Sequence, residues 1–375
     1  MTQDQPTPRL ELRDVQKSFD EVEAVKGSSL SVERGEFLSL LGPSGCGKST
    51  TLSMIAGFLT PDSGEIRVDG TVVNNIPPQK RRIGLVFQDY AIFSRLTVRQ
   101  NLAFGLEAQK VEKAERERRI GEISEKLDLQ QMLTRRGGSL NMSEMQRVAI
   151  ARVLVTQPEL LLLDEPMSNL DASLRASLRG ELKQIQKDLE QTVLYVTHDQ
   201  VEAMSMSDRI AVMHGGSLLQ TGSPEEIYNR PVNRFIAEFI GDPPINIIDC
   251  DVTVSGGKIA VKTAMLDAAE LGAGNSSPGR HLLGIRPHDV ILATEPAAGT
   301  SPSVVRFVEN LGSEHILHID HGDDIIAAVA EPHFAGVGDT VHFSFNMLRA
   351  HLIDRESGDV AVVDRSPGQS GRRTA

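Results

Sequence analysis

The chain is poor in cysteine and has no long apolar run. Only two cysteines, Cys46 and Cys250, occur in 375 residues, which excludes a disulfide framework. The longest obvious apolar run is Leu160–Leu163, whereas a membrane-spanning helix needs about 18 such residues. The first residues, MTQDQPTPRL, also lack the apolar core of a secretory signal. We therefore expect the chain to work in the reducing cytosol.

The charge balance is acidic. Lys and Arg together number 39 against 51 Asp and Glu, which gives a formal net charge of −12. A surface of that sign repels nucleic acid, so we expect no nucleic-acid partner and only local phosphate binding. At about 150 residues per domain, the length allows two or three domains, each with its own core.

The apolar pattern changes near residue 241. Before it, short strand-like runs alternate with helical stretches, which is typical of an α/β fold with a mostly parallel sheet. A charged helical segment with Ile120, Ile123 and Leu127 on one face lies within this part. We predict an α/β domain over 1–241 with a helical subdomain at about 90–158, an all-β domain over 242–364 and a disordered tail over 365–375.

A Gly-rich loop follows the first clear strand, Phe37–Leu41. Residues 42–49 read GPSGCGKS and fit the pattern G-x-x-x-x-G-K-[ST], in which backbone N–H groups surround phosphate oxygens at a helix N-terminus. A helix predicted over 48–59 completes the strand–loop–helix order. Lys48 would contact the β and γ phosphates, and the Ser49 hydroxyl would bind Mg²⁺. The alternative is a Gly-rich turn with an exposed lysine.

Two carboxylates stand at the end of the most apolar strand. Asp164 and Glu165 directly follow Leu160–Leu163, where unpaired charges are costly unless they handle a cation or a proton. Asp164 suits Mg²⁺, and Glu165 would polarise the water that attacks the γ-phosphate. A buried salt-bridge pair is the alternative.

Two further strands are followed by polar side chains. His198 follows Val193–Thr197, and we predict that it contacts the γ-phosphate and orients Glu165. Gln88 follows Gly84–Phe87, with an amide able to touch Mg²⁺ and the attacking water. A lone histidine is more often structural, and Gln88 by itself favours neither role.

Together these segments resemble the ATP-binding subunit of ABC transporters over nearly the whole chain. The resemblance implies a P-loop NTPase that uses ATP and Mg²⁺, with a Walker A loop at 42–50, a Walker B strand at 160–165, a Q-loop at Gln88 and a switch histidine at His198. It implies ATP contacts by Gly42, Pro43, Ser44, Gly45, Cys46, Gly47, Lys48, Ser49 and Thr50, and metal contacts by Ser49, Gln88 and Asp164. Phe19 is similar to the aromatic that stacks on adenine; an ordinary core position is its alternative.

Three C-terminal segments restrict the resemblance to one class of ABC transporters. They read GIRP over 284–287, VENLG over 308–312 and HLID over 351–354, and they are similar to the OB/TOBE-like β extension of carbohydrate-class importers. The resemblance implies an ATPase that energises uptake of a sugar or polyol, glycerol included. The extension would enlarge the dimer or serve as a regulatory domain. An iron, polyamine or sulfate importer and a soluble non-transport ABC ATPase stay open.

The same resemblance implies membrane partners. These are two transmembrane permease subunits and an extracytoplasmic solute-binding protein, with this chain peripheral on the cytoplasmic face of the membrane. Residues 90–93, YAIF, lie where the family docks a short helix of its membrane subunit. Core packing is the alternative for them.

The signature segment departs from the family pattern L-S-G-G-Q. This chain has LNMSE over 140–144, so Met142 and Ser143 replace two glycines and Glu144 brings a negative charge toward a triphosphate. The family presents this helix start to the nucleotide of the opposite subunit, which implies a dimer interface at Asn141, Ser143 and, in the D-loop, Asp171. We favour a heterodimer whose partner has an intact signature. A homodimer that tolerates the change is the alternative.

Overall fold

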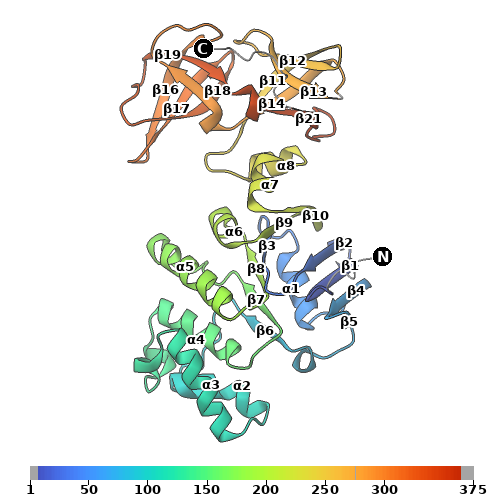
Figure 1. The fold of residues 1–375 in the computed structure, drawn as a ribbon, viewed down its shortest axis with the longest axis vertical. Coiled ribbons are helices and arrows are strands. Elements are labelled where there is room, and N and C mark those ends of the chain that lie inside the picture. The colour runs from blue at the N-terminus through green and yellow to red at the C-terminus, as the bar shows by residue number, and fades with distance from the viewer. Residues whose placement is uncertain (1–6, 275, 365–375) are drawn as a thin grey trace, which may run out of the picture. The chain divides into compact units, whose positions relative to one another are not determined.

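The computed structural model describes residues 7–274 and 276–364 (Figure 1). The chain forms two compact units that divide between Pro224 and Glu225. This division places α8 (Arg234–Phe239) and nearly all of α7 (Pro224–Asn229) in the second unit, whereas the predicted boundary at 241 assigns them to the first. The tail predicted over 365–375 lies outside the described residues.

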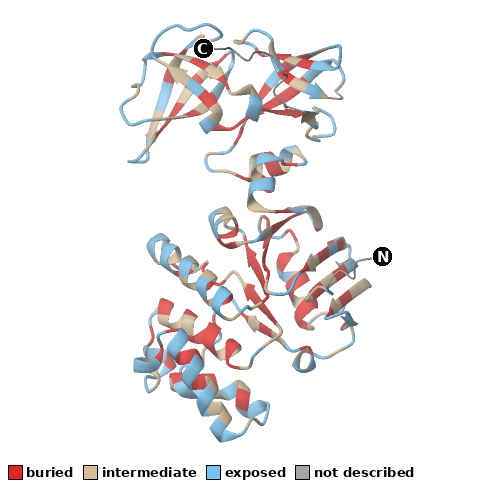
Figure 2. Ribbon diagram, in the orientation of Figure 1, coloured by how far each residue is buried: buried red, intermediate tan, exposed pale blue. Residues whose placement is uncertain are grey.

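A six-stranded sheet forms the centre of the first unit. Its order is β10-β9-β3-β8-β7-β6, and all neighbours except β10 and β9 are parallel. The strands are β3 (Phe37–Leu41), β6 (Ile83–Val86), β7 (Leu160–Asp164), β8 (Val193–Thr197), β9 (Arg209–His214) and β10 (Ser217–Gly222). β3 and β8 are buried along their whole length (Figure 2). Parallel strands buried on both faces have near-continuous apolar sequences, which is why their bounds agree with the prediction.

A smaller sheet shares an apolar core with the central one. Its order is β2-β1-β4-β5, with β1 (Leu10–Phe19), β2 (Val22–Val32), β4 (Ser63–Val68) and β5 (Thr71–Val72). The helix α1 (Lys48–Ala56) contributes to the same core. It ends before the predicted residue 59 because Gly57 adopts a left-handed conformation, φ 91°, and closes the helix.

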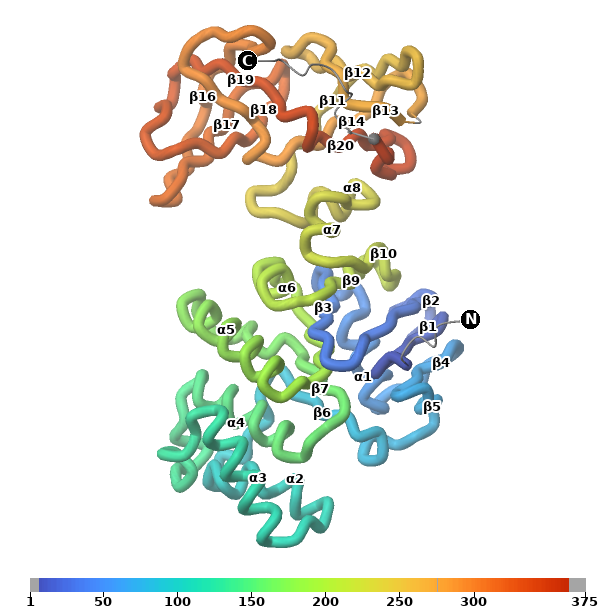
Figure 3. Tube along the Cα trace, viewed as in Figure 1, coloured from blue at the N-terminus to red at the C-terminus, as the bar shows by residue number. Residues whose placement is uncertain are grey.

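Three helices form the predicted helical group. They are α2 (Val98–Ala108), α3 (Lys113–Lys126) and α4 (Met142–Leu154), which gather beside β6 and β7 in the trace (Figure 3). Ile120, Ile123 and Leu127 are buried in their core, while Arg118 pairs with Glu115 and Glu122 on the outside. The predicted apolar face of this segment is therefore confirmed. Two more helices, α5 (Ala172–Asp188) and α6 (Gln200–Met206), follow.

The second unit is built on two antiparallel sheets around one core. One has the order β20-β14-β11-β12-β13-β21 and the other β15-β19-β16-β17-β18. The strands are β11 (Asn246–Ser255), β12 (Lys258–Lys262), β13 (Ala269–Gly274), β14 (Gly279–Ile285), β15 (Val290–Ala293), β16 (Ser301–Asn310), β17 (His315–His321), β18 (Asp324–Ala330), β19 (Thr340–Phe345), β20 (His351–Ile353) and β21 (Val363–Asp364). Among the described residues, no helix has the length and apolar character of a membrane span.

Buried Arg286 explains why this unit begins before Gly241. Its guanidinium donates hydrogen bonds to the carbonyls of Tyr228, Ala237 and Ile240. It also lies 4.1 Å from the centroid of the Tyr228 ring. These bonds tie α7 and α8 to the β-rich part, a long-range contact that composition along the chain does not reveal.

Candidate nucleotide-binding site

The Gly-rich loop connects the carboxyl end of β3 to the start of α1. Gly47 caps α1 with φ 106° and no side-chain hydrogen bond, so the first N–H groups of the helix face the loop. A Cβ at Gly47 would lie 2.3 Å from the Ala24 carbonyl oxygen, and one at Gly42 would lie 2.1 Å from that of Met213. Both positions therefore require glycine, and the loop has the form of a phosphate cradle.

Lys48 lies across this loop. Its side chain is buried, and Nζ donates to the carbonyl oxygens of Gly42, at 2.7 Å, and Pro43, at 3.0 Å. The alternative of a turn with an exposed lysine does not hold.

Asp164 has the surroundings of a metal ligand. Burial, helped by the neighbouring Glu165, raises the pKa of its carboxyl, while the positive charge of Lys48 and a hydrogen bond with the Ser49 side chain oppose the rise. Its Oδ1 is buried and has no hydrogen-bond partner in the described part of the chain. A carboxylate oxygen left over beside a serine hydroxyl fits Mg²⁺, which prefers oxygen ligands.

At neutral pH, we expect Asp164→Asn to stabilise the nucleotide-free chain and to remove Mg²⁺-dependent ATP binding. Folding raises the pKa of Asp164, so the protonated carboxyl stabilises the folded state at low pH, and this stabilisation is lost as the pH rises through the folded-state pKa. At neutral pH the site therefore holds a buried negative charge. A neutral amide avoids the cost of the buried charge, a gain of about 1 kcal/mol, or roughly 2–4 °C in Tm. Thermal unfolding with and without Mg²⁺ and ATP measures both effects.

The matched control is Asp267→Asn, which changes an exposed carboxylate in the loop before β13. We expect it to alter neither quantity. A lower Tm for the nucleotide-free Asp164→Asn chain would contradict the assignment.

Glu165 turns away from Asp164 toward His198. Its backbone is left-handed, φ 44°, and its N–H donates to the Val196 carbonyl at 2.9 Å. Its Oε2 lies 3.1 Å from Nδ1 of His198. Left-handed backbone is unusual for a non-glycine residue and concentrates at functional sites. The structure thus brings together two residues that the sequence predicts as partners.

The remaining predicted residues lie around this centre. Gln88 Nε2 donates to Ser168 Oγ at 3.2 Å. Phe19 is exposed, with Lys17 Nζ 5.6 Å from its ring centroid, so it is not a core residue. Asp171 caps α5 by accepting from the Leu174 N–H at 3.0 Å.

The signature segment forms a capping box. Asn141 Oδ1 accepts from the Glu144 N–H, and Glu144 Oε2 accepts from the Asn141 N–H, both at 2.9 Å. Glu144 also pairs with Arg135 at 2.8 Å, and this partner lowers the pKa of the carboxyl. The negative charge that the sequence places near a triphosphate is therefore held within its own helix start. The spacing N-x-x-E is the signal that predicts such a box.

Residues 90–93 divide between the two roles that the sequence leaves open. Tyr90 is buried in the core with Val86 and Leu102, so core packing accounts for it. Exposed aromatic rings lie nearby instead, in two pairs. Phe58 and Phe87 have centroids 6.2 Å apart, and Phe93 and Phe104 have centroids 4.6 Å apart.

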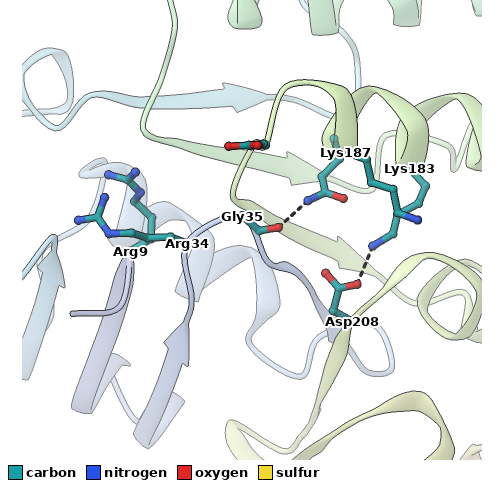
Figure 4. A pocket seen from close by; sticks show the side chains of 8 residues that line it. Arg9, Arg34, Gly35, Lys183, Lys187 and Asp208 are labelled. Atoms are coloured by element: carbon teal, nitrogen blue, oxygen red, sulfur yellow. Dashed lines mark hydrogen bonds and ion pairs between the residues drawn. The ribbon is translucent and has the colours of Figure 1, made fainter. Parts of the chain in front are cut away.

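A basic pocket of about 590 Å³ is lined by α5 and by residues that precede β1, β3 and β9, at the other end of the sheet from the loop. Arg9 and Arg34 extend from one side, and Lys183 and Lys187 from α5 on the other (Figure 4). Arg9 and Arg34 both pair with Asp69, and Lys183 pairs with Asp208. Acidic residues of this chain thus balance most of the positive charge of the pocket. The pocket also lies away from the Gly-rich loop, so it adds no residue to the nucleotide-binding site.

The loop, Lys48, Asp164, Glu165 and His198 at one edge of a parallel sheet define a P-loop nucleotide-binding protein. The family model of ABC transporters matches residues 25–168, and that of the TOBE domain matches residues 283–353. The chain is 43% identical over 364 residues to a trehalose/maltose import ATP-binding protein of Thermococcus litoralis, covering 92% of this chain and 98% of the relative.

Other relatives are similar over nearly their whole length. A xylose/arabinose import ATP-binding protein of Haloferax volcanii is 42% identical, with 96% and 97% of the two chains covered. An sn-glycerol-3-phosphate import ATP-binding protein of Rhizobium johnstonii is 38% identical, with 94% and 95% covered. The solved structure of cbiO1 from Clostridium perfringens, part of an ABC transporter complex, has a TM-score of 0.56 at 31% identity, covering 59% of this chain and 90% of that one. This chain belongs to the ATP-binding subunits of ABC import systems and is an ATP hydrolase.

Proposed function

We propose that the chain hydrolyses ATP with Mg²⁺ between the Gly-rich loop and the ends of β7 and β8 to energise solute uptake. The contact between Glu165 and His198, 3.1 Å, is the observation that carries the proposal. Residues 42–50 and Phe19 hold the nucleotide, and Ser49, Gln88 and Asp164 hold the metal. The ion, when bound, neutralises phosphate charge.

Glu165 accepts a proton from the attacking water. His198 holds the Glu165 carboxylate in place through Nδ1 and contacts the γ-phosphate. Lys48, which already bridges two loop carbonyls, supplies a positive charge to the terminal phosphates. Each of these groups stands at the end of a buried strand or in the loop, so the scaffold fixes their positions.

We infer a sugar or polyol as the solute. The relatives named above import trehalose or maltose, xylose or arabinose, and sn-glycerol-3-phosphate. Glycerol, a polyol smaller than these, stays among the candidates. Such a solute would reach two permease subunits from an extracytoplasmic binding protein.

The exposed aromatic pairs support docking of a permease at the cytoplasmic face of the membrane. Phe87 directly precedes Gln88, so a partner seated on these rings would move the segment that carries a proposed metal ligand. Exposed apolar surface of this kind marks interaction sites. Phe93 keeps the docking role that the sequence predicts, while Tyr90 does not.

The capping box supports a heterodimer. The N–H groups of Asn141 and Glu144 are already satisfied within the chain, so they are not available to a phosphate on the opposite subunit. The Glu144 carboxylate also stands at the positive end of α4, where an anion would bind. A nucleotide facing this segment would be held poorly, and a partner with an intact signature would complete the site that contains Lys48.

ATP hydrolysis by the purified chain alone tests this proposal. We expect little turnover from the chain by itself. Vesicles containing the chain, the second cassette, the permeases and the binding protein should show ATP-driven uptake of a labelled sugar or polyol. Robust cooperative turnover without a second cassette would defeat the heterodimer, and a complete complex without uptake of such solutes would defeat the assigned cargo.

A further inference from the structure

A buried polar cluster joins β8 to α6, the two elements that flank His198, and has no part in the proposed chemistry. Glu202, in α6, is 3% exposed, and both Tyr195 Oη and Thr197 Oγ1 donate to its Oε2 at 2.7 Å. Tyr195 and Thr197 are themselves buried in β8. Burying a carboxylate destabilises the folded state unless the carboxylate accepts hydrogen bonds. The two hydroxyls therefore make burial of Glu202 possible.

The cluster fixes the turn that carries His198 from both sides. The Thr197 hydroxyl donates to Glu202 and also accepts from the Asp199 N–H at 2.9 Å. Asp199 Oδ1 in turn accepts from the Glu202 N–H at 3.1 Å and caps α6. The residues directly before and after His198 are therefore bound into one closed set of hydrogen bonds.

Arg175 connects this turn to the segment that follows Glu165. It reaches Asp199 Oδ2 at 3.4 Å and donates to the Leu170 carbonyl at 2.9 Å. Ser168 in the same segment donates to the Glu165 carbonyl at 2.9 Å. The backbones on the two sides of the Glu165–His198 contact are thus held relative to each other.

We propose that Glu202 is a positioning residue that holds His198 against Glu165 through Thr197 and Asp199. The inference rests on the proposed roles of Glu165 and His198. A catalytic group displaced by about 1 Å can cost up to roughly 100-fold in rate. Loss of this support should therefore slow hydrolysis without weakening ATP binding, because neither Glu202 nor Thr197 belongs to the loop that holds the phosphates.

Three substitutions in the full chain, assayed in the assembled transporter, test the support. Thr197→Val removes the hydroxyl at constant shape and should lower kcat about 10-fold with little change in the KM for ATP. Thr197→Ser restores the hydroxyl and should restore the rate. Glu202→Met keeps the length of the side chain but removes the oxygen that accepts from both hydroxyls, so it should lower kcat as Thr197→Val does; an unchanged kcat for Glu202→Met would overturn the role of Glu202.

Thr192→Val is the matched control. Thr192 is also buried, lies just before the other end of β8, and accepts from the Gly35 N–H through its hydroxyl at 2.9 Å. Its loss should lower the Tm as much as that of Thr197 while kcat stays unchanged. An equal fall in kcat would show that Thr197→Val acts through general loss of stability, and would overturn the proposal.

The same variants in a His198→Ala background separate the positioning inference from the proposed role of His198 in hydrolysis. If His198→Ala is slow and Thr197→Val adds nothing to it, Thr197 acts through His198, as proposed. If Thr197→Val slows the His198→Ala chain by its full factor, the positioning inference is wrong. If His198→Ala alone turns over at the wild-type rate, the proposed role of His198 fails first.

Discussion

Glu165→Gln is expected to lower ATP hydrolysis by the assembled transporter at least 100-fold while ATP binding persists. The Glu165 carboxylate is held at 3.1 Å from His198 by a left-handed backbone, and an amide of the same shape cannot accept a proton from water. General base catalysis contributes about 10²–10⁴ in rate. Phosphate release gives kcat, and equilibrium titration of the variant with nucleotide gives the affinity.

Glu125→Gln is the control for this loss. Glu125 is an exposed carboxylate on α3, in the helical group, and its replacement should leave kcat unchanged. Retention of more than about a tenth of the wild-type rate by Glu165→Gln would assign water activation to another group, since a general base is worth more than that.

The parts of the fold that depend on local pattern could be predicted. β3 and β8 have the predicted bounds because both faces of each strand are buried, so every residue is constrained to be apolar or satisfied. The division of the chain into units could not, because it depends on hydrogen bonds from Arg286 to carbonyls more than forty positions away. Nothing in the local composition around 241 carries that information.

The site shows the same distinction. Glu165 and His198 follow adjacent parallel strands, so strand order alone brings them to one edge. The burial of Tyr90 could not be predicted, because it depends on packing against the helical group, which the sequence does not orient. The spacing N-x-x-E at 141–144 predicts the capping box, because that box depends only on residues of one helix start. The ion pair of Glu144 with Arg135 could not be predicted, because Arg135 lies outside this helix start and is brought to it by the fold.

Substitution of the loop lysine should have unequal effects in the two cassettes of the proposed heterodimer. Lys48→Ala in this chain should abolish ATPase activity and uptake, with a loss of more than about 100-fold, because electrostatic stabilisation of the terminal phosphates is removed from the one competent site. The corresponding substitution in the partner should leave most of the activity, since its nucleotide faces Asn141 and Glu144, whose N–H groups are already occupied.

Steady-state hydrolysis and uptake in vesicles, measured for each single variant and for both together, decide the matter. Lys187→Ala, which removes an exposed lysine of α5, should behave as the wild type and controls for loss of positive charge. A partner variant that is as inactive as Lys48→Ala would mean two equivalent sites. In that case Met142, Ser143 and Glu144 still support hydrolysis, and the capping box is compatible with phosphate contact across the dimer.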